Sequence, residues 1–342
     1  MKILIVKLGS IGDVVNTIPL FNILRESLTD SFIAWAIEPK AYPIIKNIDL
    51  VDKIIIFDRY HCLKSLPAFI FRLKKERFDI VLDLQRILKS GFFTFLSRAK
   101  RRIGFDKDRC KEFSWIWTNE RIPASDPEKH MVEQYLEFAR YLNITNSKVR
   151  WDVDISRGEE PKLKKFFFGF YEKPIAINIG ASKPANRWFP ESFASLIDIL
   201  QNDYHIPVIL TGGPEDEKFA RIIKERTKSK FIDLVGKTSL NFLAGIFKGC
   251  RLFIGCDTGP MHIAVAMGSP VVSLFGASNP RRTGPYGYLD LVVRKEIDCS
   301  PCNKKKCPTR DCMRLIKPSD VLEKVDKVLN NKRNNHNINE FL

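Results

Sequence analysis

Short apolar runs rich in β-branched residues alternate with helical patterns in both halves of this chain, and this alternation restricts its fold more than any other feature. In the first half we expect strands over residues 3–6, 32–37, 53–57 and 80–83, with a first helix over 15–27. In the second half we expect strands over 175–179, 208–210, 231–233, 252–254 and 271–274. The pattern predicts an α/β protein with two doubly wound, Rossmann-like domains.

The domain boundary is expected between residues 149 and 162, where a charged stretch precedes a new strand. We predict a first domain over 1–155, a second over 160–329 that ends in a helix capped by Ser319, and a polar, disordered tail over 330–342. Ligands of doubly wound domains bind at the carboxyl ends of the strands. We therefore expect the two domains to face each other across a ligand-binding cleft.

The formal net charge of +16 attracts anions, which leaves nucleic acids, nucleotide-sugar phosphates and acidic membranes as partners. The basic residues are spread along the chain without a known nucleic-acid module, so we expect no nucleic-acid partner. Lys7 interrupts the apolar start of the chain, and no later segment reaches the ~18 apolar residues of a membrane helix. We expect a cytoplasmic protein.

Four of the eight cysteines gather in a Lys- and Pro-rich segment as Cys299, Cys302, Cys307 and Cys312. One CxxC pair with two further cysteines is compatible with a structural zinc, but a second CxxC pair is missing. Reduced thiols or a local disulfide are the alternatives. The other four cysteines lack metal-ligand spacing and are expected to be small apolar residues.

The turn after the first expected strand, residues 7–13, also opens the first helix. Gly9 and Gly12 allow a ligand to approach the backbone closely, and a helix N-terminus attracts negative charge. The segment is not a dinucleotide fingerprint, because GxGxxG requires another glycine two residues after Gly9. Asp13 could merely interact with the helix dipole, but its position at a strand end favours a general base that takes a hydroxyl proton.

A second turn, residues 257–262, follows the expected strand over 252–254. Asp257 or Thr258 suits the N-cap of a helix, Pro260 suits its first turn, and Gly259 leaves backbone N–H groups open to a phosphate. This turn is therefore predicted to bind a diphosphate. His262 could donate to a phosphate oxygen or be satisfied within the fold.

Two further segments, residues 180–190 and 211–217, also follow expected strands and should lie along one rim. Lys183 and Arg187 can neutralise a departing nucleoside diphosphate. Glu215 or Asp216 could bind ribose hydroxyls. Trp188 is expected to pack in the interior.

Taken in order, these motifs resemble those of glycosyltransferase family 9, the ADP-heptose:lipopolysaccharide heptosyltransferases. The matching segments are KLGSIGDVVNTIPL, FDIVLDLQRILKS, RRIGF, GASKPANRWFP, TGGPEDE, GCDTGPMHIAVAMGSPVVSLFG and CSPC, and they span most of residues 1–313. Each motif alone is weakly specific, whereas the ordered set is specific for the family.

The resemblance implies a B-type glycosyltransferase fold, with the acceptor bound mainly by the first domain and the donor by the second. It also implies inversion at the anomeric carbon without a catalytic metal or other cofactor. Asp13 looks like the general base. The predicted donor-binding residues are Gly12, Thr211, Gly212, Gly213, Glu215, Asp257, Thr258, Gly259, Pro260, Met261 and His262. Many relatives have lysine where this chain has Asn186, so Lys183 or Arg187 must supply the cation that faces the diphosphate.

The implied acceptor is the inner-core oligosaccharide of lipopolysaccharide, linked to lipid A. Its candidate cations are Arg59, Lys64, Lys89, Arg101 and Arg102, each of which could equally be a solvated surface charge. We expect a monomer in peripheral contact with the anionic inner face of the inner membrane. The alternatives are a related transferase with another nucleotide sugar or core position, and a nucleotide-dependent dehydrogenase, which the missing GxGxxG disfavours.

Overall fold

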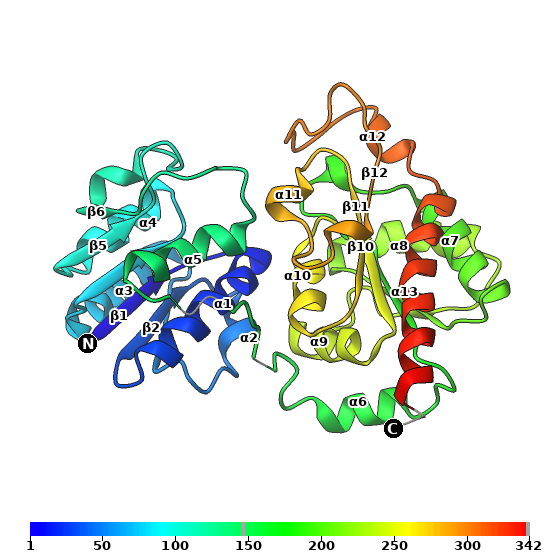
Figure 1. Ribbon diagram of the computed structural model, residues 1–342, viewed down its shortest axis with the longest axis horizontal. Helices are drawn as coiled ribbons and strands as arrows, with labels where there is room; N and C mark the ends of the chain where they lie inside the picture. Colours follow the sequence, from blue (N-terminus) through cyan, green and yellow to red (C-terminus); the bar gives the residue numbers. More distant parts are fainter. Residues whose placement is uncertain (146–147, 153, 340–342) are drawn as a thin grey trace. The chain divides into compact units, whose positions relative to one another are not determined.

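The structure is a computed structural model that describes residues 1–145, 148–152 and 154–339. Its chain divides into two compact units, Met1–Ile155 and Ser156–Leu342 (Figure 1). This division lies within the interval where the sequence predicts a domain boundary. Each unit is an α/β domain built on a six-stranded sheet, and every pair of neighbouring strands is parallel.

The first unit has the strand order β3-β2-β1-β4-β5-β6. Its strands are β1 (Lys2–Val6), β2 (Phe32–Ile37), β3 (Lys53–Ile56), β4 (Ile80–Asp83), β5 (Arg101–Gly104) and β6 (Glu120–Arg121). Its helices are α1 (Ile11–Ser27), α2 (Tyr42–Ile45), α3 (Cys62–Glu76), α4 (Leu88–Leu96), the 3-10 turn η1 (Ser114–Trp117) and α5 (Met131–Tyr141). The sequence did not predict β5 and β6, because they are short and rich in charged residues.

The second unit repeats this arrangement with the order β12-β11-β10-β7-β8-β9. Its strands are β7 (Ile175–Asn178), β8 (Val208–Thr211), β9 (Ile232–Asp233), β10 (Leu252–Cys256), β11 (Val271–Phe275) and β12 (Val292–Arg294). Its helices are α6 (Glu160–Phe167), α7 (Pro190–Asn202), α8 (Glu217–Arg226), α9 (Leu240–Gly249), α10 (Gly259–Ala266), α11 (Pro280–Thr283), α12 (Asp311–Arg314) and α13 (Pro318–Asn339). Three 3-10 turns complete it: η2 (Pro184–Asn186), η3 (Pro214–Asp216) and η4 (Leu289–Leu291).

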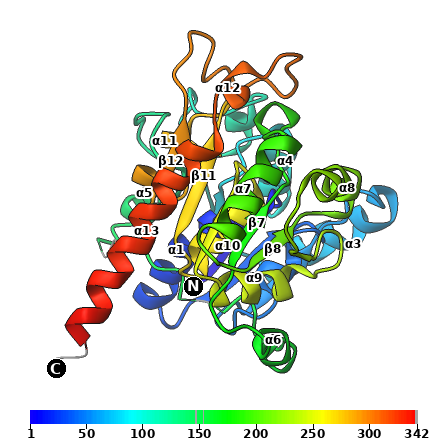
Figure 2. The ribbon, with the colours of Figure 1, turned by 90° about the vertical axis from the view of Figure 1, so that its right-hand side faces the viewer.

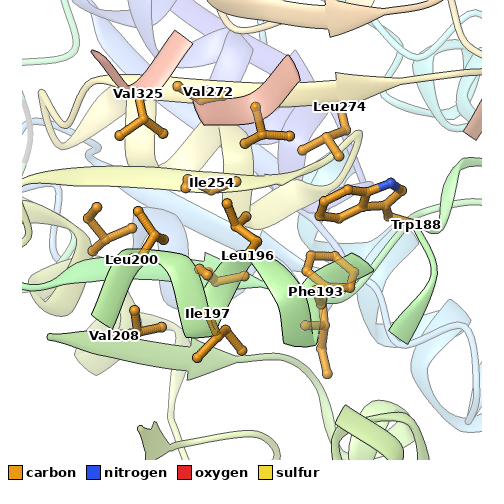
Figure 3. Packing of buried hydrophobic residues seen from close by; sticks show 14 of the residues in the cluster. Trp188, Phe193, Leu196, Ile197, Leu200, Val208, Ile254, Val272, Leu274 and Val325 are labelled. Atoms are coloured by element: carbon orange, nitrogen blue, oxygen red, sulfur yellow. The ribbon is translucent and has the colours of Figure 1, made fainter. Parts of the chain in front are cut away.

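Helices α7 and α13 lie side by side and cover one face of the second sheet (Figure 2). Their apolar residues pack on the sheet around Ile254 and Leu274, as Figure 3 shows. Trp188 is fully buried in this cluster and its indole Nε1 donates to the carbonyl of Ile316 at 3.0 Å. The prediction that Trp188 packs in the interior is confirmed.

The strand order places a topological switch point in each sheet, between β1 and β4 and between β7 and β10. Connections run in opposite directions from these neighbouring strands, so the loops that leave their carboxyl ends diverge and leave room for a ligand. The turn over residues 7–13 follows β1, and the turn over residues 257–262 follows β10. Both predicted ligand turns therefore lie at switch points.

The end of the second unit differs from the prediction. Helix α13 begins at Pro318, preceded by Lys317, so Ser319 lies within the first turn and is not the N-cap. The carboxylate of Asp320 accepts from the Lys317 backbone N–H at 2.8 Å and caps this end instead. The helix continues to Asn339 where a disordered tail was expected, because no proline or glycine follows Pro318 to stop it. Residues 340–342 lie outside the described residues.

Among the helices that the structure describes, none combines the length and the apolarity needed to cross a membrane.

Candidate active site

Asp13 lies in the first turn of α1, directly after the carboxyl end of β1. The helix begins at Ile11, four residues earlier than predicted, with Ser10 as the N-cap. The carboxylate of Asp13 is 36% exposed and contacts a lysine and a tyrosine. Lys7 Nζ lies 3.1 Å from Oδ2, and the hydroxyl of Tyr135 donates to Oδ1 at 3.4 Å. Lys7 and Tyr135 thus hold the carboxylate, while part of it stays open to solvent, as a general base requires.

Lys7 is the buried cation of this half of the site, with only 3% of its side chain exposed. Its Nζ also donates to the carbonyl of Leu84 at 3.4 Å and lies 5.1 Å from the centre of the Tyr135 ring. Burial lowers the pKa of Lys7, and the carboxylates of Asp13 and Asp83 act in the opposite direction. The two carboxylates therefore favour the charged form of Lys7, which burial disfavours.

Asp83 ends β4, the strand next to β1 across the switch point. Its side chain is buried and accepts from the Ser90 hydroxyl at 3.1 Å and from the Gln85 backbone N–H at 3.0 Å. Burial raises the pKa of Asp83 to about 6. Sequence reasoning did not assign roles to Lys7, Asp83 or Tyr135. A charged residue at the end of an apolar strand was the available signal for the first two.

Glu38 gathers two of the predicted acceptor cations beside the β1 turn. It follows β2, and its Oε2 would lie 3.7 Å from a Cβ placed on Gly9. Lys89 Nζ contacts Glu38 Oε1 at 2.7 Å, and Arg59 Nε lies 3.6 Å from Oε2. The sequence analysis missed Glu38, which is the residue that brings these two cations to the rim.

The other predicted acceptor cations lie elsewhere. Arg101 and Arg102 are the first two residues of β5. They therefore lie at the amino ends of the parallel strands, whereas the ligand turns follow the carboxyl ends. Arg101 makes a bidentate pair with Glu120, and Arg102 donates to backbone carbonyls of Ala99 and Trp117. Lys64 is exposed on α3. The structure does not bring Arg101 and Arg102 together with Asp13. All strands of this sheet run in the same direction, so residues that begin one strand lie at the opposite end of the sheet from residues that follow another.

In the second unit, residues 257–262 form the start of α10. Thr258 is its N-cap in an extended conformation, and its side chain makes no capping hydrogen bond. Pro260 occupies the first turn as predicted. It has no N–H, and the Met261 N–H donates to the Thr258 carbonyl at 3.2 Å, so the Gly259 N–H is the group at the start of this helix that an anion would meet. The side chains of Asp257, Met261 and His262 are buried.

The segment after β7 is tied to this turn. The Ser182 backbone N–H and hydroxyl both donate to the Asp257 carbonyl, at 3.0 and 2.7 Å. Asn186 is fully buried and its amide donates to the Asp257 carboxylate at 3.3 Å and to the Ser278 hydroxyl at 2.6 Å. Asn186 therefore links the loop after β7 to the loops after β10 and β11.

Lys183 and Arg187 differ in their surroundings. Arg187 pairs with Asp216, whose side chain is 2% exposed. A Cβ on Gly180 would lie 3.0 Å from the same carboxylate, so glycine is needed for this close approach. Lys183 Nζ donates to the carbonyl of Asn303 at 3.4 Å, a long hydrogen bond to a neutral group. Asp216 thus neutralises Arg187, whereas the contact of Lys183 is with an uncharged carbonyl.

The segment after β8 contributes two exposed carboxylates, Glu215 and Glu217, and one buried carboxylate, Asp216. Thr211 is fully buried, and its hydroxyl bonds to Asn178 at 3.1 Å and to the Ile177 carbonyl at 3.2 Å. The carboxylate of Asp216 pairs with Arg187 and accepts a hydrogen bond from the Gly213 backbone N–H at 3.0 Å. Glu215 is exposed at the start of η3. Of the two acids proposed to bind ribose, Asp216 is paired within the fold, whereas Glu215 is exposed to solvent.

The four clustered cysteines are all reduced. Cys312 is buried beside Gly276, whereas Cys299 is exposed. The thiol of Cys307 accepts from the Arg310 backbone N–H at 3.4 Å, and this contact is the largest of the causes that lower its pKa. Among the residues that the structure describes, no group of three or more His, Cys, Asp or Glu side chains is arranged to hold a metal ion.

The two parallel sheets, each with a switch point, and the likeness to solved structures define the fold class, a B-type glycosyltransferase fold. The sequence profile described as glycosyltransferase family 9 (heptosyltransferase) matches residues 67–313. The chain therefore belongs to glycosyltransferase family 9, which excludes the alternative of a dehydrogenase.

Individual proteins agree with this assignment. The chain is 27% identical to the lipopolysaccharide core heptosyltransferase OpsX of Haemophilus influenzae, over 84% of this chain and 83% of that protein. It is 26% identical to lipopolysaccharide heptosyltransferase 1 of Campylobacter coli, over 96% and 99%. The solved ADP-heptose lipopolysaccharide heptosyltransferase II of Escherichia coli superposes with a TM-score of 0.80 at 22% identity, covering 97% of this chain and all of that one.

Proposed function

We propose that this protein transfers heptose from ADP-heptose to the inner-core oligosaccharide of lipopolysaccharide, with inversion at the anomeric carbon. The family and the names of the relatives support this donor and acceptor. The observation that carries the proposal is the partly exposed carboxylate of Asp13 at a switch point, in contact with a buried lysine and a tyrosine hydroxyl. We further propose that the protein is cytoplasmic and acts as a monomer at the inner face of the inner membrane.

In the proposed reaction the acceptor hydroxyl attacks the anomeric carbon while the bond from that carbon to the ADP oxygen breaks. Asp13 accepts the hydroxyl proton, and ADP departs with the electrons of the broken bond. Lys7 and Tyr135 hold the Asp13 carboxylate in one orientation. Lys89 and Arg59, held at the rim by Glu38, are the candidate contacts for the anionic acceptor.

The leaving ADP is assigned to the second unit. The N-terminus of α10, with the Gly259 N–H and the positive end of the helix dipole, binds the diphosphate, and Lys183 supplies a cation for its developing charge. Glu215 is assigned to the ribose hydroxyls. No metal ion or cofactor takes part in these steps.

Mass spectrometry of the product formed from ADP-heptose and a defined core acceptor tests the proposal. Asp13→Asn should abolish transfer and leave ADP affinity within about twofold, because it removes the proton acceptor and keeps the shape. Tyr135→Phe is the matched control: it removes the hydroxyl that donates to Asp13 at 3.4 Å, keeps the carboxylate and should retain most of the rate. Full turnover by Asp13→Asn would refute the assignment of the base, and transfer only from another nucleotide sugar would refute the donor.

A further inference from the structure

Large apolar side chains remain exposed on one face of the first unit, although a folded domain normally buries such groups. On α3, Leu63 is 94% exposed and Phe71 is 64% exposed. On α4 and around η1 the exposed fractions reach 47% at Phe95 and 71% at Phe113. We call this surface the α3–α4 face; its apolar members are Leu63, Pro67, Phe71, Leu88, Phe92, Phe95, Phe113 and Ile116.

The two helices present these residues in one direction. Phe69 of α3 and Phe93 of α4 are buried in the same cluster, with ring centres 4.8 Å apart, against one face of the sheet. Their opposite sides therefore both point away from that sheet face. Leu63, Pro67 and Phe71 follow one another at intervals of four, which makes a continuous apolar stripe along the outer side of α3.

Segment η1 extends the face beyond α4. A Cβ on Gly91 would lie 2.7 Å from the Trp117 indole, and Trp117 also contacts Phe92 and Phe95 with ring centres 5.6 and 5.2 Å apart. This packing leaves the neighbouring side chains of Phe113 and Ile116 outside, 71% and 52% exposed. The apolar surface is therefore supported by tight packing beneath it.

Cations border the apolar stripe. Helix α3 carries Lys64, Arg72, Lys74 and Lys75, all exposed, and one acid, Glu76, which is bonded to Lys53 and Lys2. Exposed Arg98, Lys100, Lys107 and Lys111 lie next to α4 and η1 in the chain. An apolar stripe bordered by lysine and arginine complements the acyl boundary and the anionic headgroups of a bilayer.

The face also adjoins the proposed acceptor residues. Leu88 and Lys89 are the first residues of α4, and Lys89 is the cation that Glu38 holds beside the β1 turn. We propose that the α3–α4 face docks on an anionic phospholipid bilayer, which presents a lipid-linked acceptor to the Asp13 half of the site. The benefit to catalysis rests on the proposed function, whereas the docking itself does not.

Flotation of the purified full-length chain with vesicles tests the docking without donor or acceptor. Vesicles of phosphatidylcholine with about a third phosphatidylglycerol should bind the chain, and binding should weaken with salt. Leu63→Ser/Phe71→Ser and, separately, Lys74→Glu/Lys75→Glu should each weaken binding at least tenfold. The substituted side chains are exposed, so unchanged thermal unfolding is expected and would show that the fold is intact.

Helix α6 of the second unit offers a matched control, because it also exposes aromatic and basic side chains. Phe168→Ser/Tyr171→Ser and Lys164→Glu/Lys165→Glu should leave vesicle binding unchanged. An equal loss in the α6 variants, full binding by the α3 variants, or no vesicle binding by the unaltered chain would overturn the proposal. Self-association that Leu63→Ser/Phe71→Ser dissolves, without vesicle binding, would instead assign the face to a second copy.

The same α3 variants separate this inference from the proposed function. Their rate with a water-soluble, deacylated core acceptor should equal that of the unaltered chain, while their rate with acceptor in anionic vesicles should fall. Absence of transfer in every variant and in the unaltered chain would reject the proposed function and leave the vesicle result standing. Equal rates on both acceptors would overturn the role of the face in presenting the acceptor.

Discussion

Replacing Lys183 and Arg187 separately should distinguish a cation that binds the leaving diphosphate from one that stabilises the fold. Arg187→Ala removes the partner of Asp216, whose side chain is 2% exposed. Breaking a buried ion pair in this way costs about 3–5 kcal/mol, because the remaining charge is left without compensation. Arg187 itself is 24% exposed, so water can enter its place in the variant and solvate part of the Asp216 charge. We therefore expect the free energy of unfolding to fall by about 3 kcal/mol.

Lys183→Ala should have the opposite profile. Its 3.4 Å hydrogen bond to a carbonyl contributes little, so the free energy of unfolding should change by less than about 0.5 kcal/mol. The transfer rate should fall by about 10²–10³, the usual effect of removing one group that stabilises developing charge. Lys183→Arg should recover part of the rate, because it restores the charge.

Urea unfolding and transfer rates of the same preparations measure both effects. Arg187→Met/Asp216→Asn is the control, since removing both charges and keeping an acceptor for the Gly213 N–H should restore most of the stability. An unchanged rate in Lys183→Ala would refute its role toward the diphosphate. Normal stability of Arg187→Ala would refute the claim that Asp216 needs this cation.

Three further outcomes follow from the geometry. The pKa of Asp83 is raised to about 6 in the folded protein, above the value of 3.8 expected on unfolding, so the protein loses stability as the pH rises through this window. Asp83→Asn should therefore raise the free energy of unfolding by about 3 kcal/mol at pH 8 and by almost nothing below pH 4; a gain independent of pH, measured by urea unfolding, would contradict this. Gly259→Val places a branched side chain at the start of α10 and should weaken ADP binding at least tenfold by calorimetry, and unchanged affinity would remove this turn from the donor site. Chelator treatment should leave the transfer rate unchanged, whereas complete loss would overturn the metal-free reaction.

Much of the fold could be predicted because local patterns decide it. Nine strands begin and end close to the predicted positions, since apolar β-branched runs bounded by turn residues specify strands on their own. Strands β5, β6 and β12 were missed. They contain charged residues or span only two or three positions, and pairing with a neighbouring strand makes them strands.

The predicted ligand turns could likewise be located from the sequence, because glycines, an N-cap residue and a proline indicate the start of a helix without tertiary information. That reasoning selected Asp13 and the turn over residues 257–262 as candidate site residues. It could not choose between Lys183 and Arg187, which are four residues apart and both basic. The choice depends on Asp216, a residue far along the chain that only folding places beside Arg187.

The same limit applies to the cations of the first unit. By itself, the sequence determined the two α/β domains, their switch-point turns and the presence of many basic residues. Tertiary structure alone decided that Glu38 holds Lys89 and Arg59 at the rim, while Arg101 and Arg102 lie at the opposite end of the sheet. The physical reason is that the charge of a side chain depends on its residue type alone. The partner that neutralises or orients that side chain depends on the register and direction of strands that are distant in sequence.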